Sequence, residues 1–363
     1  MRSQSMIPRL TGPVLIGATL LGGAAQAEIA RRDFTVISDP GVKLAVREVS
    51  DTEGPSGKPP IVLLHGARVP GVATFDLPVE GGSLAVDLVR AGHRVFIMDA
   101  RGYGGSSRHG QDGSQDGQPL VRSDMVVRDV GAVVDAVQAR TGVSQVALLG
   151  WATGGHWAGM YASQKPSEVS HLVLYNSLYG VHAGHKTLGP GSDMADPSNP
   201  DQFNIQRFGA YRLNTAASLL PSWDRSIPIE DKVAWRDPKV AEAYQAAALA
   251  SDPSSRSRNP PSFRAPSGAM ADSFELASGH KLWDAGPIAA HVLVIRSAND
   301  FWSRPEDVTT LAQDLRKAAS VRMVTIPEAT HYVHLDRPER GRRSFVAEVI
   351  RTLEHPPKTR AAH

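Results

Sequence analysis

The chain has no cysteine among its 363 residues, so disulfide bonds, thiolate metal sites and a cysteine nucleophile are all excluded. An excess of one charge is missing as well, because 39 Lys and Arg stand against 37 Asp and Glu. The basic residues form no long run, so the electrostatic signature of a nucleic-acid-binding protein is absent. The apolar run at 13–23 is about a dozen residues long, which is too short to span a bilayer. The sequence carries no signal for an oligomeric state.

The first residues have the pattern of a secretory signal. Only two charged residues, both arginines, precede Glu28, and the apolar run at 13–23 is followed by a small-x-small site at 25–27. We therefore expect residues 1–27 to be a signal peptide that is cleaved near Ala27, leaving a periplasmic or secreted protein. The alternative is a disordered or helical N-terminal arm.

After residue 27, short apolar runs alternate with helical patterns, which is typical of a parallel α/β sheet covered on both faces. The first two runs flank an Asp39-Pro40-Gly41 turn and predict an antiparallel hairpin. The expected strands are 34–37, 42–46, 61–64, 94–98, 145–149, 171–175, 291–295 and 321–326. The expected helices are 84–88, 125–137 with Ser123-Asp124 as its N-cap, 155–162, 305–315 and 342–353.

Two stretches interrupt this alternation. Residues 108–118 are rich in Gly, Gln, Asp and Ser and predict an exposed loop. Residues 178–288 contain no convincing strand and are too long for a connecting loop. We expect them to form a helical cap over the carboxyl edge of the sheet, with 253–268 mobile. The core would then comprise residues 28–177 and 289–363.

The segment Gly150-Trp151-Ala152-Thr153-Gly154 lies between an expected strand and an expected helix. A glycine two residues before and another two residues after the centre of such a turn is the pattern of a nucleophile elbow, G-x-S-x-G, which here reads G-x-A-x-G. The N–H of Thr153, at the start of the helix, is a candidate donor to an oxyanion. Ala152 itself carries no nucleophile, so this chain cannot form an acyl-enzyme at that position.

Three further side chains or backbone groups follow strands at the same edge of the sheet. In Leu64-His65-Gly66-Ala67, the N–H of Ala67 is a candidate second oxyanion donor. Asp300 and His331 follow the last two strands, in the order nucleophile, acid, histidine. His331 would take the proton from a nucleophile and return it to the leaving group, and Asp300 would orient the imidazole. His334 is a competing candidate for the base.

These motifs, with Asp99-Ala100-Arg101-Gly102-Tyr103-Gly104-Gly105-Ser106, resemble the α/β-hydrolase superfamily, and most closely its esterases, lactonases, haloperoxidase-like hydrolases and prolyl aminopeptidase-like enzymes. The resemblance implies an α/β-hydrolase fold with a mostly parallel central sheet flanked by helices, a structural role for segment 99–106, and no metal or organic cofactor. A dinucleotide-binding loop is the alternative for that segment, but the third glycine of its motif would fall on Ser107. The chain departs from the family pattern at Ala152, where serine is usual, and at Thr330, where glycine is often found.

The resemblance predicts hydrolysis of a carboxylic ester in a small-molecule substrate through an acyl-enzyme, by a form of the chain with serine at 152. Amide, lactone or peptide hydrolysis by the same triad remains open, as does an aspartate nucleophile of the dehalogenase or epoxide hydrolase kind. Ala152 is interpreted as an engineered replacement of serine, because the acid, the base and the oxyanion segments are all retained. The alternative is a natural, non-catalytic ligand-binding homologue.

The remaining polar candidates have simpler interpretations. His156 begins a helix and is expected to be neutral, because a cation there would oppose the helix dipole. His182 and His185 lack further ligands in register and predict a surface loop, not a metal site. Glu306 and Asp307 are expected to favour a helix N-terminus. Aromatic residues of the cap would either line an apolar pocket, with two or three reaching the site, or attach the cap to the core: Phe203, Phe208, Tyr211, Trp223, Trp235, Tyr244 and Trp283.

Overall fold

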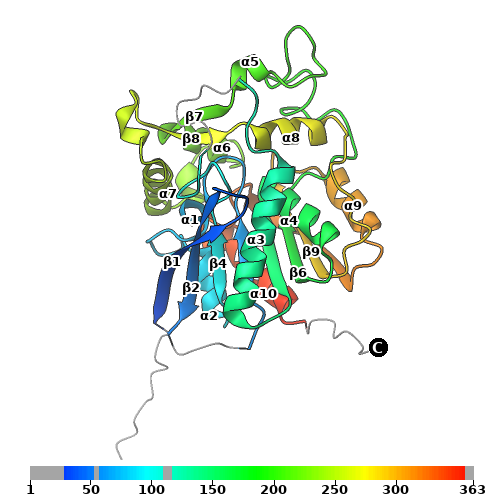
Figure 1. Ribbon diagram of the computed structural model, residues 1–363. Coiled ribbons are helices and arrows are strands. Elements are labelled where there is room, and N and C mark those ends of the chain that lie inside the picture. The colour runs from blue at the N-terminus through cyan, green and yellow to red at the C-terminus, as the bar shows by residue number, and fades with distance from the viewer. Residues whose placement is uncertain (1–27, 53–56, 109–116, 356–363) are drawn as a thin grey trace, which may run out of the picture.

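A computed structural model describes residues 28–52, 57–108 and 117–355. The predicted signal peptide at 1–27 and most of the predicted loop at 108–118 lie outside these residues. The central feature is an eight-stranded sheet in the order β1-β2-β4-β3-β5-β6-β9-β10, with helices on both faces (Figure 1). β4, β3, β5, β6, β9 and β10 are mutually parallel, whereas β1 and β2 form the predicted antiparallel hairpin. The predicted α/β-hydrolase architecture is thus confirmed.

Every predicted strand is present, but β1 begins five residues before its predicted start, and β2, β9 and β10 end four or five residues after their predicted ends. Their interior residues are buried in β3 to β6, as expected for strands covered on both faces. The strands of the large sheet are β1 Ile29–Ile37, β2 Lys43–Asp51, β3 Ile61–Leu64, β4 Val95–Met98, β5 Val146–Trp151, β6 Val169–Tyr175, β9 His291–Asn299 and β10 Ser320–Thr330.

The helices of the core also follow the predicted pattern, with clear local causes for their ends. The Ser83 side chain caps α2 by accepting the N–H of Val86, and α3 ends at Gly142 in the left-handed conformation (φ 73°). The predicted N-cap of α3 is wrong, because Ser123 is already helical and Arg122 occupies the cap position. The core helices are α1 Gly71–Phe75, α2 Leu84–Arg90, α3 Ser123–Thr141, α4 Thr153–Gln164, α9 Pro305–Asp314 and α10 Arg342–Leu353.

Residues 178–288, called the insertion below, run between β6 and β9 and lie beyond one end of the sheet (Figure 1). The prediction that this segment contains no strand is wrong. β7 Tyr211–Thr215 and β8 Ser262–Pro266 pair antiparallel in a second sheet, and β8 lies within the stretch predicted to be mobile. The helices of the insertion are α5 Ile205–Phe208, α6 Leu220–Asp224, α7 Pro238–Ala250 and α8 Gly268–Ala277. Short 3-10 helices span Ala217–Leu219, Lys232–Ala234, Ser255–Ser257 and, after β10, Pro338–Arg340.

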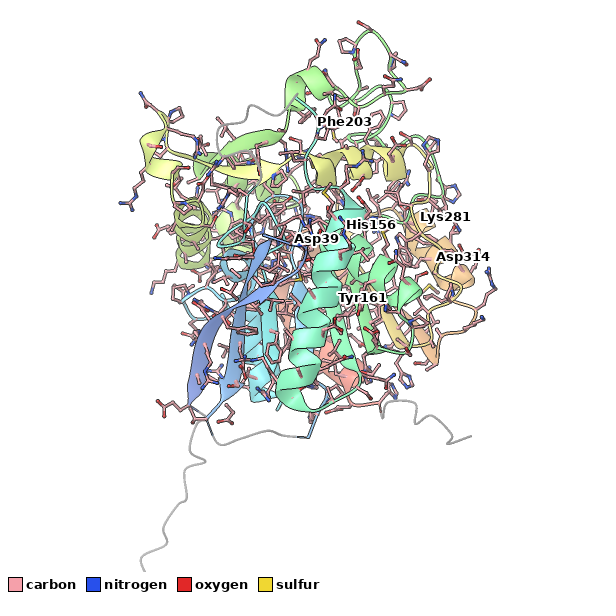
Figure 2. All side chains as sticks on the ribbon, in the orientation of Figure 1. Asp39, His156, Tyr161, Phe203, Lys281 and Asp314 are labelled. Atoms are coloured by element: carbon pink, nitrogen blue, oxygen red, sulfur yellow. The ribbon has the colours of Figure 1, made fainter. Side chains whose placement is uncertain are left out.

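Apolar side chains fill both faces of the large sheet, and the insertion shares in both clusters. Phe203 and Phe274 of the insertion pack with the cluster that contains α3 and α4, whereas Trp223 and Tyr244 pack with the cluster around α1, α2 and α10. Figure 2 shows Phe203 in the insertion and His156 and Tyr161 lower down, near α3 and α4. Among the described helices, none combines the length and the apolar character that a bilayer span needs.

Candidate active site

Ala152 lies at the sharp turn between β5 and α4, with φ 51° and ψ −115°. A positive φ is unfavourable for alanine because of its Cβ, so the surrounding structure must hold Ala152 in this strained conformation. A Cβ on Gly150 would lie 2.2 Å from the carbonyl oxygen of Gly154, and a Cβ on Gly154 would lie 2.2 Å from that of Leu64. The two glycines therefore allow strand and helix to approach, and the predicted elbow geometry is present.

His331 and Asp300 are brought together from two strand ends. Nδ1 of His331 lies 2.6 Å from Oδ1 of Asp300, and both side chains are almost fully buried. The other carboxylate oxygen of Asp300 accepts the N–H of Ser303 at 2.8 Å and the Ser303 hydroxyl. Burial raises the pKa of Asp300, but the imidazole and these hydrogen bonds outweigh it, so that the pKa lies below its ordinary value. Asp300 is thus an ionised acceptor that fixes the orientation of the ring.

The His331 ring also contacts aromatic rings on several sides. The ring of Trp151, next to Ala152, has its centre 5.0 Å from the imidazole centre, and its indole N–H donates to the His331 carbonyl at 3.0 Å. The Phe301 ring lies at 4.8 Å and the Tyr332 ring at 5.3 Å. The contact with Trp151 ties His331 to the residue that precedes the elbow centre.

The competing histidine, His334, lies in a different environment. Its side chain is fully buried, and neither ring nitrogen has a hydrogen-bond partner. Burial, followed by the neighbouring His331 and Arg342, holds the pKa of His334 well below its ordinary value. Its ring packs against Trp151 with centres 4.6 Å apart. His334 is therefore a neutral packing residue with no acid to orient it.

The two candidate oxyanion donors lie on either side of Ala152. Thr153 is the first residue of α4, so its N–H has no acceptor within the helix. The N–H of Ala67 makes no hydrogen bond within the part of the chain that the structure describes. The Ala67 carbonyl is held by two donors, the Tyr103 hydroxyl at 3.0 Å and Nη2 of Arg212 at 2.7 Å. An ideal Cβ on Gly66 would lie 3.7 Å from the Ala152 methyl, which places this loop against the elbow.

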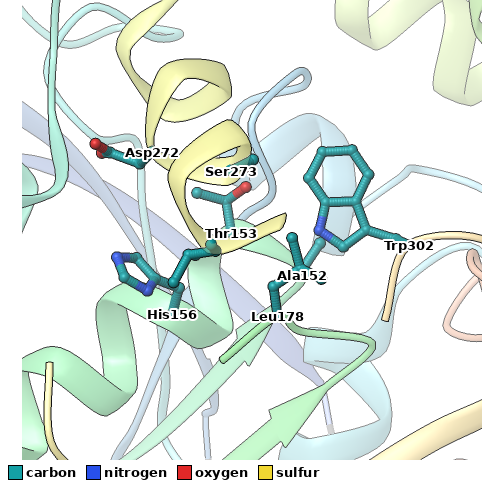
Figure 3. Close-up of a pocket in the computed structure, with 8 residues that line it drawn as sticks. Ala152, Thr153, His156, Leu178, Asp272, Ser273 and Trp302 are labelled. Carbon is teal, nitrogen blue, oxygen red and sulfur yellow. The ribbon is translucent and has the colours of Figure 1, made fainter. Parts of the chain in front are cut away.

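A narrow pocket adjoins Ala152 (Figure 3). It comprises about 190 Å³ of empty space, including space open to solvent, but it has no room for a water molecule. In Figure 3 Trp302 lies to the right of Ala152 and Leu178 lies below it, and Asp272 on α8 lies above His156. Its lining consists of Ala152, Thr153, His156, Leu178, Asp272, Ser273, Leu276 and Trp302. Trp302 was not among the residues predicted from the sequence. The one signal that could have identified it is its position two residues after Asp300.

His156 belongs to a directed chain of hydrogen bonds at the edge of this pocket. The Trp283 indole can only donate, and its N–H lies 3.0 Å from Nδ1 of His156, so the ring proton is on Nε2. Nε2 in turn lies 3.0 Å from the Ser123 hydroxyl, which donates to Asp272 at 2.6 Å. Burial lowers the pKa of His156 to about 4. The predicted neutral packing role of His156 is confirmed.

Other sequence candidates serve the structure. The His185 ring lies 2.8 Å from the Trp302 carbonyl, and no cluster of three metal-binding side chains occurs within the described ranges. Asp307 is buried and accepts the N–H groups of Tyr179 and Gly180, so it ties α9 to the loop after β6 and is more than a charge at a helix start. Of the seven aromatic residues predicted in the cap, none lines the pocket beside Ala152.

Two cations beside Ala67 have no carboxylate partner in the described residues. Arg68 donates to the neutral side chains of Asn214, Ser218 and Ser222. Arg212 donates to the Ala67 carbonyl, and its Nε is buried without a hydrogen-bond acceptor. Burial lowers the pKa of Arg212 to about 10, so it remains a cation at neutral pH. Positive charge is thus present next to the candidate oxyanion site.

Comparison with known proteins gives a consistent result. Residues 59–338 match the family described as "alpha/beta hydrolase fold". The chain is 31% identical over 153 residues to a 2-hydroxy-6-oxononadienedioate/2-hydroxy-6-oxononatrienedioate hydrolase of Klebsiella pneumoniae, covering 41% of this chain and 46% of the relative. It is 34% identical over 166 residues to a hydrolase of the same name from Dechloromonas aromatica, covering 45% and 48%. The matched region thus spans about half the length of these curated relatives.

Among solved structures, the chain is similar to 2-hydroxy-6-oxo-6-phenylhexa-2,4-dienoate hydrolase from Rhodococcus sp. strain RHA1. The TM-score is 0.57 with 16% sequence identity, and the superposition covers 91% of this chain and all of that structure. At this identity, the similarity supports the fold alone.

Proposed function

Because the chain belongs to the α/β-hydrolase fold family, we propose that its active form carries serine at position 152 and cleaves a carboxylic ester through an acyl-enzyme. In this proposal His331 is the general base and then the general acid, Asp300 orients its imidazole, and the N–H groups of Ala67 and Thr153 stabilise the oxyanion. The observation that carries the proposal is the strained elbow at Ala152, retained next to an intact Asp300–His331 pair.

The proposal also explains Ala152 as a replacement of serine. A serine hydroxyl at this position would face a pocket, and the other parts of the arrangement are present: the glycines, the acid–base pair and the free N–H groups. A chain with no use for catalysis has no reason to keep a residue in the strained conformation at the elbow. In its present form the chain would bind a substrate and leave it intact.

The residues of the insertion would control access to this site. The pocket at Ala152 has no room for a water molecule, and Ser273 and Leu276 of α8 form part of its wall. We infer that the insertion acts as a cap over the core of residues 28–177 and 289–363 and moves to admit a substrate.

The test is hydrolysis of p-nitrophenyl acyl esters of graded chain length by the Ala152→Ser variant. We expect turnover by this variant, and a loss of about 10⁴-fold when His331→Gln or Asp300→Asn is added. His334→Gln is the matched control, because His334 follows the same strand but has no acid partner, and we expect it to keep most of the activity of the folded enzyme. A serine variant that folds and binds ligands but is inert on all esters would favour the ligand-binding alternative.

A second reaction, hydrolysis of a carbon–carbon bond next to a carbonyl, is favoured by a separate observation. The curated relatives are named as hydrolases of a dienedioate, a substrate with two carboxylates. Arg68 and Arg212 offer unpaired positive charge beside Ala67, where a carboxylate of such a substrate could be held. Comparing the Ala152→Ser variant on neutral esters and on a 2-hydroxy-6-oxo-dienedioate distinguishes the two reactions, and Arg68→Gln, which leaves the bond from Arg212 to the Ala67 carbonyl in place, should weaken mainly the second.

A further inference from the structure

Asp336 is a buried carboxylate five residues after His331, and the mechanism proposed above does not use it. Its side chain is 1% exposed, and it forms no ion pair within the described ranges. Burial without a cation is costly for a carboxylate, so its oxygens must be satisfied by hydrogen bonds. Three donors supply these bonds, and they come from both the His331 loop and the insertion.

Two of the donors belong to Thr330, the residue immediately before His331. Its N–H donates to Oδ2 of Asp336 at 2.9 Å, and its hydroxyl donates to Oδ1 at 2.8 Å. The hydroxyl is the donor in the second bond because an ionised carboxylate can only accept, and the Thr330 oxygen in addition accepts the N–H of Tyr332 at 3.0 Å. Asp336 therefore fixes the backbone before His331 directly, at the Thr330 N–H, and the backbone after His331 through the Thr330 hydroxyl, which binds the Tyr332 N–H. Glycine, common at this position in the family, would supply only the backbone bond.

The third donor is Trp223 in α6 of the insertion. Its indole N–H lies 2.9 Å from Oδ1 of Asp336, and its ring stacks on Tyr332 with centres 5.1 Å apart. Trp235, in the same part of the insertion, donates to the Glu328 carbonyl at 2.7 Å, and Arg337 N–H donates to the Trp235 carbonyl. The loop around His331 is thus attached to the insertion at several points, and Asp336 is the one that reaches Thr330.

We propose that Asp336 is a positioning residue, which holds the His331 imidazole against Asp300 by joining Thr330 to Trp223 of the insertion. This rests on the proposed role of His331 as the base. It also means that a displacement of α6 is transmitted to the base through one carboxylate. Asp336 itself acts through the backbone of Thr330 and contacts no reacting atom in the proposal.

The proposal is tested first without activity, on the Ala152 protein labelled with 15N-histidine. The short bond between His331 and Asp300 should give a low-field ring N–H resonance, which His331→Gln assigns by its loss. We expect Asp336→Asn to shift or broaden this resonance, because an amide must place its NH2 group against either the Thr330 N–H or the Trp223 N–H, so that one of these donors loses its acceptor. Thr330→Val, which removes only the hydroxyl, should give a smaller shift than Asp336→Asn. Thr330→Ser, which keeps the hydroxyl, should leave the resonance at its position in the parent protein. Glu339→Gln, an exposed carboxylate in the same loop, is the matched control.

The same variants are then measured in the Ala152→Ser enzyme. A 1 Å misplacement of a catalytic group can cost about 100-fold in rate, so we expect kcat to fall by about 10- to 100-fold with Asp336→Asn while KM changes little. An unchanged His331 resonance in folded Asp336→Asn and Thr330→Val proteins would overturn the proposal. An inert serine enzyme would leave the resonance test intact and would count against the proposed reaction alone.

Discussion

The buried histidine next to the elbow makes the stability of the protein depend on pH in a predictable direction. Burial lowers the pKa of His156 from 6.5 to about 4. The folded chain therefore keeps the ring neutral, whereas the unfolded chain protonates it below pH 6.5, so stability is lost as the pH falls from 6.5 to about 4. At about 1.4 kcal/mol per pKa unit, the difference of about 2.5 units contributes about 3 kcal/mol.

The perturbation is His156→Gln, which keeps an acceptor for Trp283 and a donor for Ser123 but cannot titrate. Urea unfolding, followed by tryptophan fluorescence at pH 7 and pH 4, gives the free energy of unfolding of each protein. Between these two pH values we expect the variant to lose about 3 kcal/mol less than the parent chain. Other groups that titrate in this range are the same in both proteins and cancel in the difference.

His182→Gln is the matched control, because the His182 side chain is exposed and forms no ion pair within the described residues. It should follow the parent chain at both pH values. Equal losses of stability in the His156→Gln variant and the parent would refute the reasoning, because they would mean that His156 binds its proton equally well in the folded and unfolded chains.

Three more predictions concern groups whose contacts are equally well defined. Gly154→Ala would place a Cβ 2.2 Å from a backbone carbonyl of β3, so we expect a loss of at least about 3 kcal/mol in urea unfolding. Asp129→Ala leaves the buried guanidinium of Arg101, now 2.5 Å from Asp129, without its main partner, and should cost about 3 kcal/mol in the same assay. Burial raises the pKa of Asp336 to about 7, so the contribution of Asp336 to stability falls as the pH rises from about 4 to 7. Asp336→Asn should remove this dependence of the free energy of unfolding on pH, and a variant with the same dependence as the parent would contradict the prediction.

The core of the fold could be predicted from the sequence because its strands are short runs of apolar residues covered on both faces. Val146–Leu149 and Leu172–Leu174 are apolar throughout, and the first of them is followed by a glycine-rich turn and a helix pattern. The elbow could also be predicted, because the close approach of strand and helix requires glycines at fixed positions on either side of the turn.

The second sheet could not be predicted from local sequence. β7 reads Tyr-Arg-Leu-Asn-Thr and β8 reads Ser-Phe-Arg-Ala-Pro, so neither shows a continuous apolar run. Each becomes a strand only by pairing with the other, and nearly fifty residues separate them. The predicted N-cap at Ser123 was wrong for a similar reason, because the Ser123 hydroxyl donates to Asp272 of α8 and does not cap its own helix.

The candidate site was predicted in part. Asp300 and His331 could be placed because they follow consecutive strands, and the structure brings their side chains to 2.6 Å. Trp302 and Asp336 could not be placed, because nothing in the spacing shows that one lines the pocket and the other binds Thr330 and Trp223. Such contacts depend on how the insertion packs on the core. The spacing of apolar residues predicts helices and strands, but it does not predict this packing.

The central claim is that residue 152 is the position of a nucleophile activated by His331. The most direct measurement is intact-mass spectrometry of the Ala152→Ser protein after treatment with a fluorophosphonate, with peptide mapping of the adduct. The account predicts one phosphonyl group per chain, on residue 152, and none on the Ala152 protein or on Ala152→Ser combined with His331→Gln. A folded serine protein that stays unlabelled, or that is labelled at another residue, would contradict it.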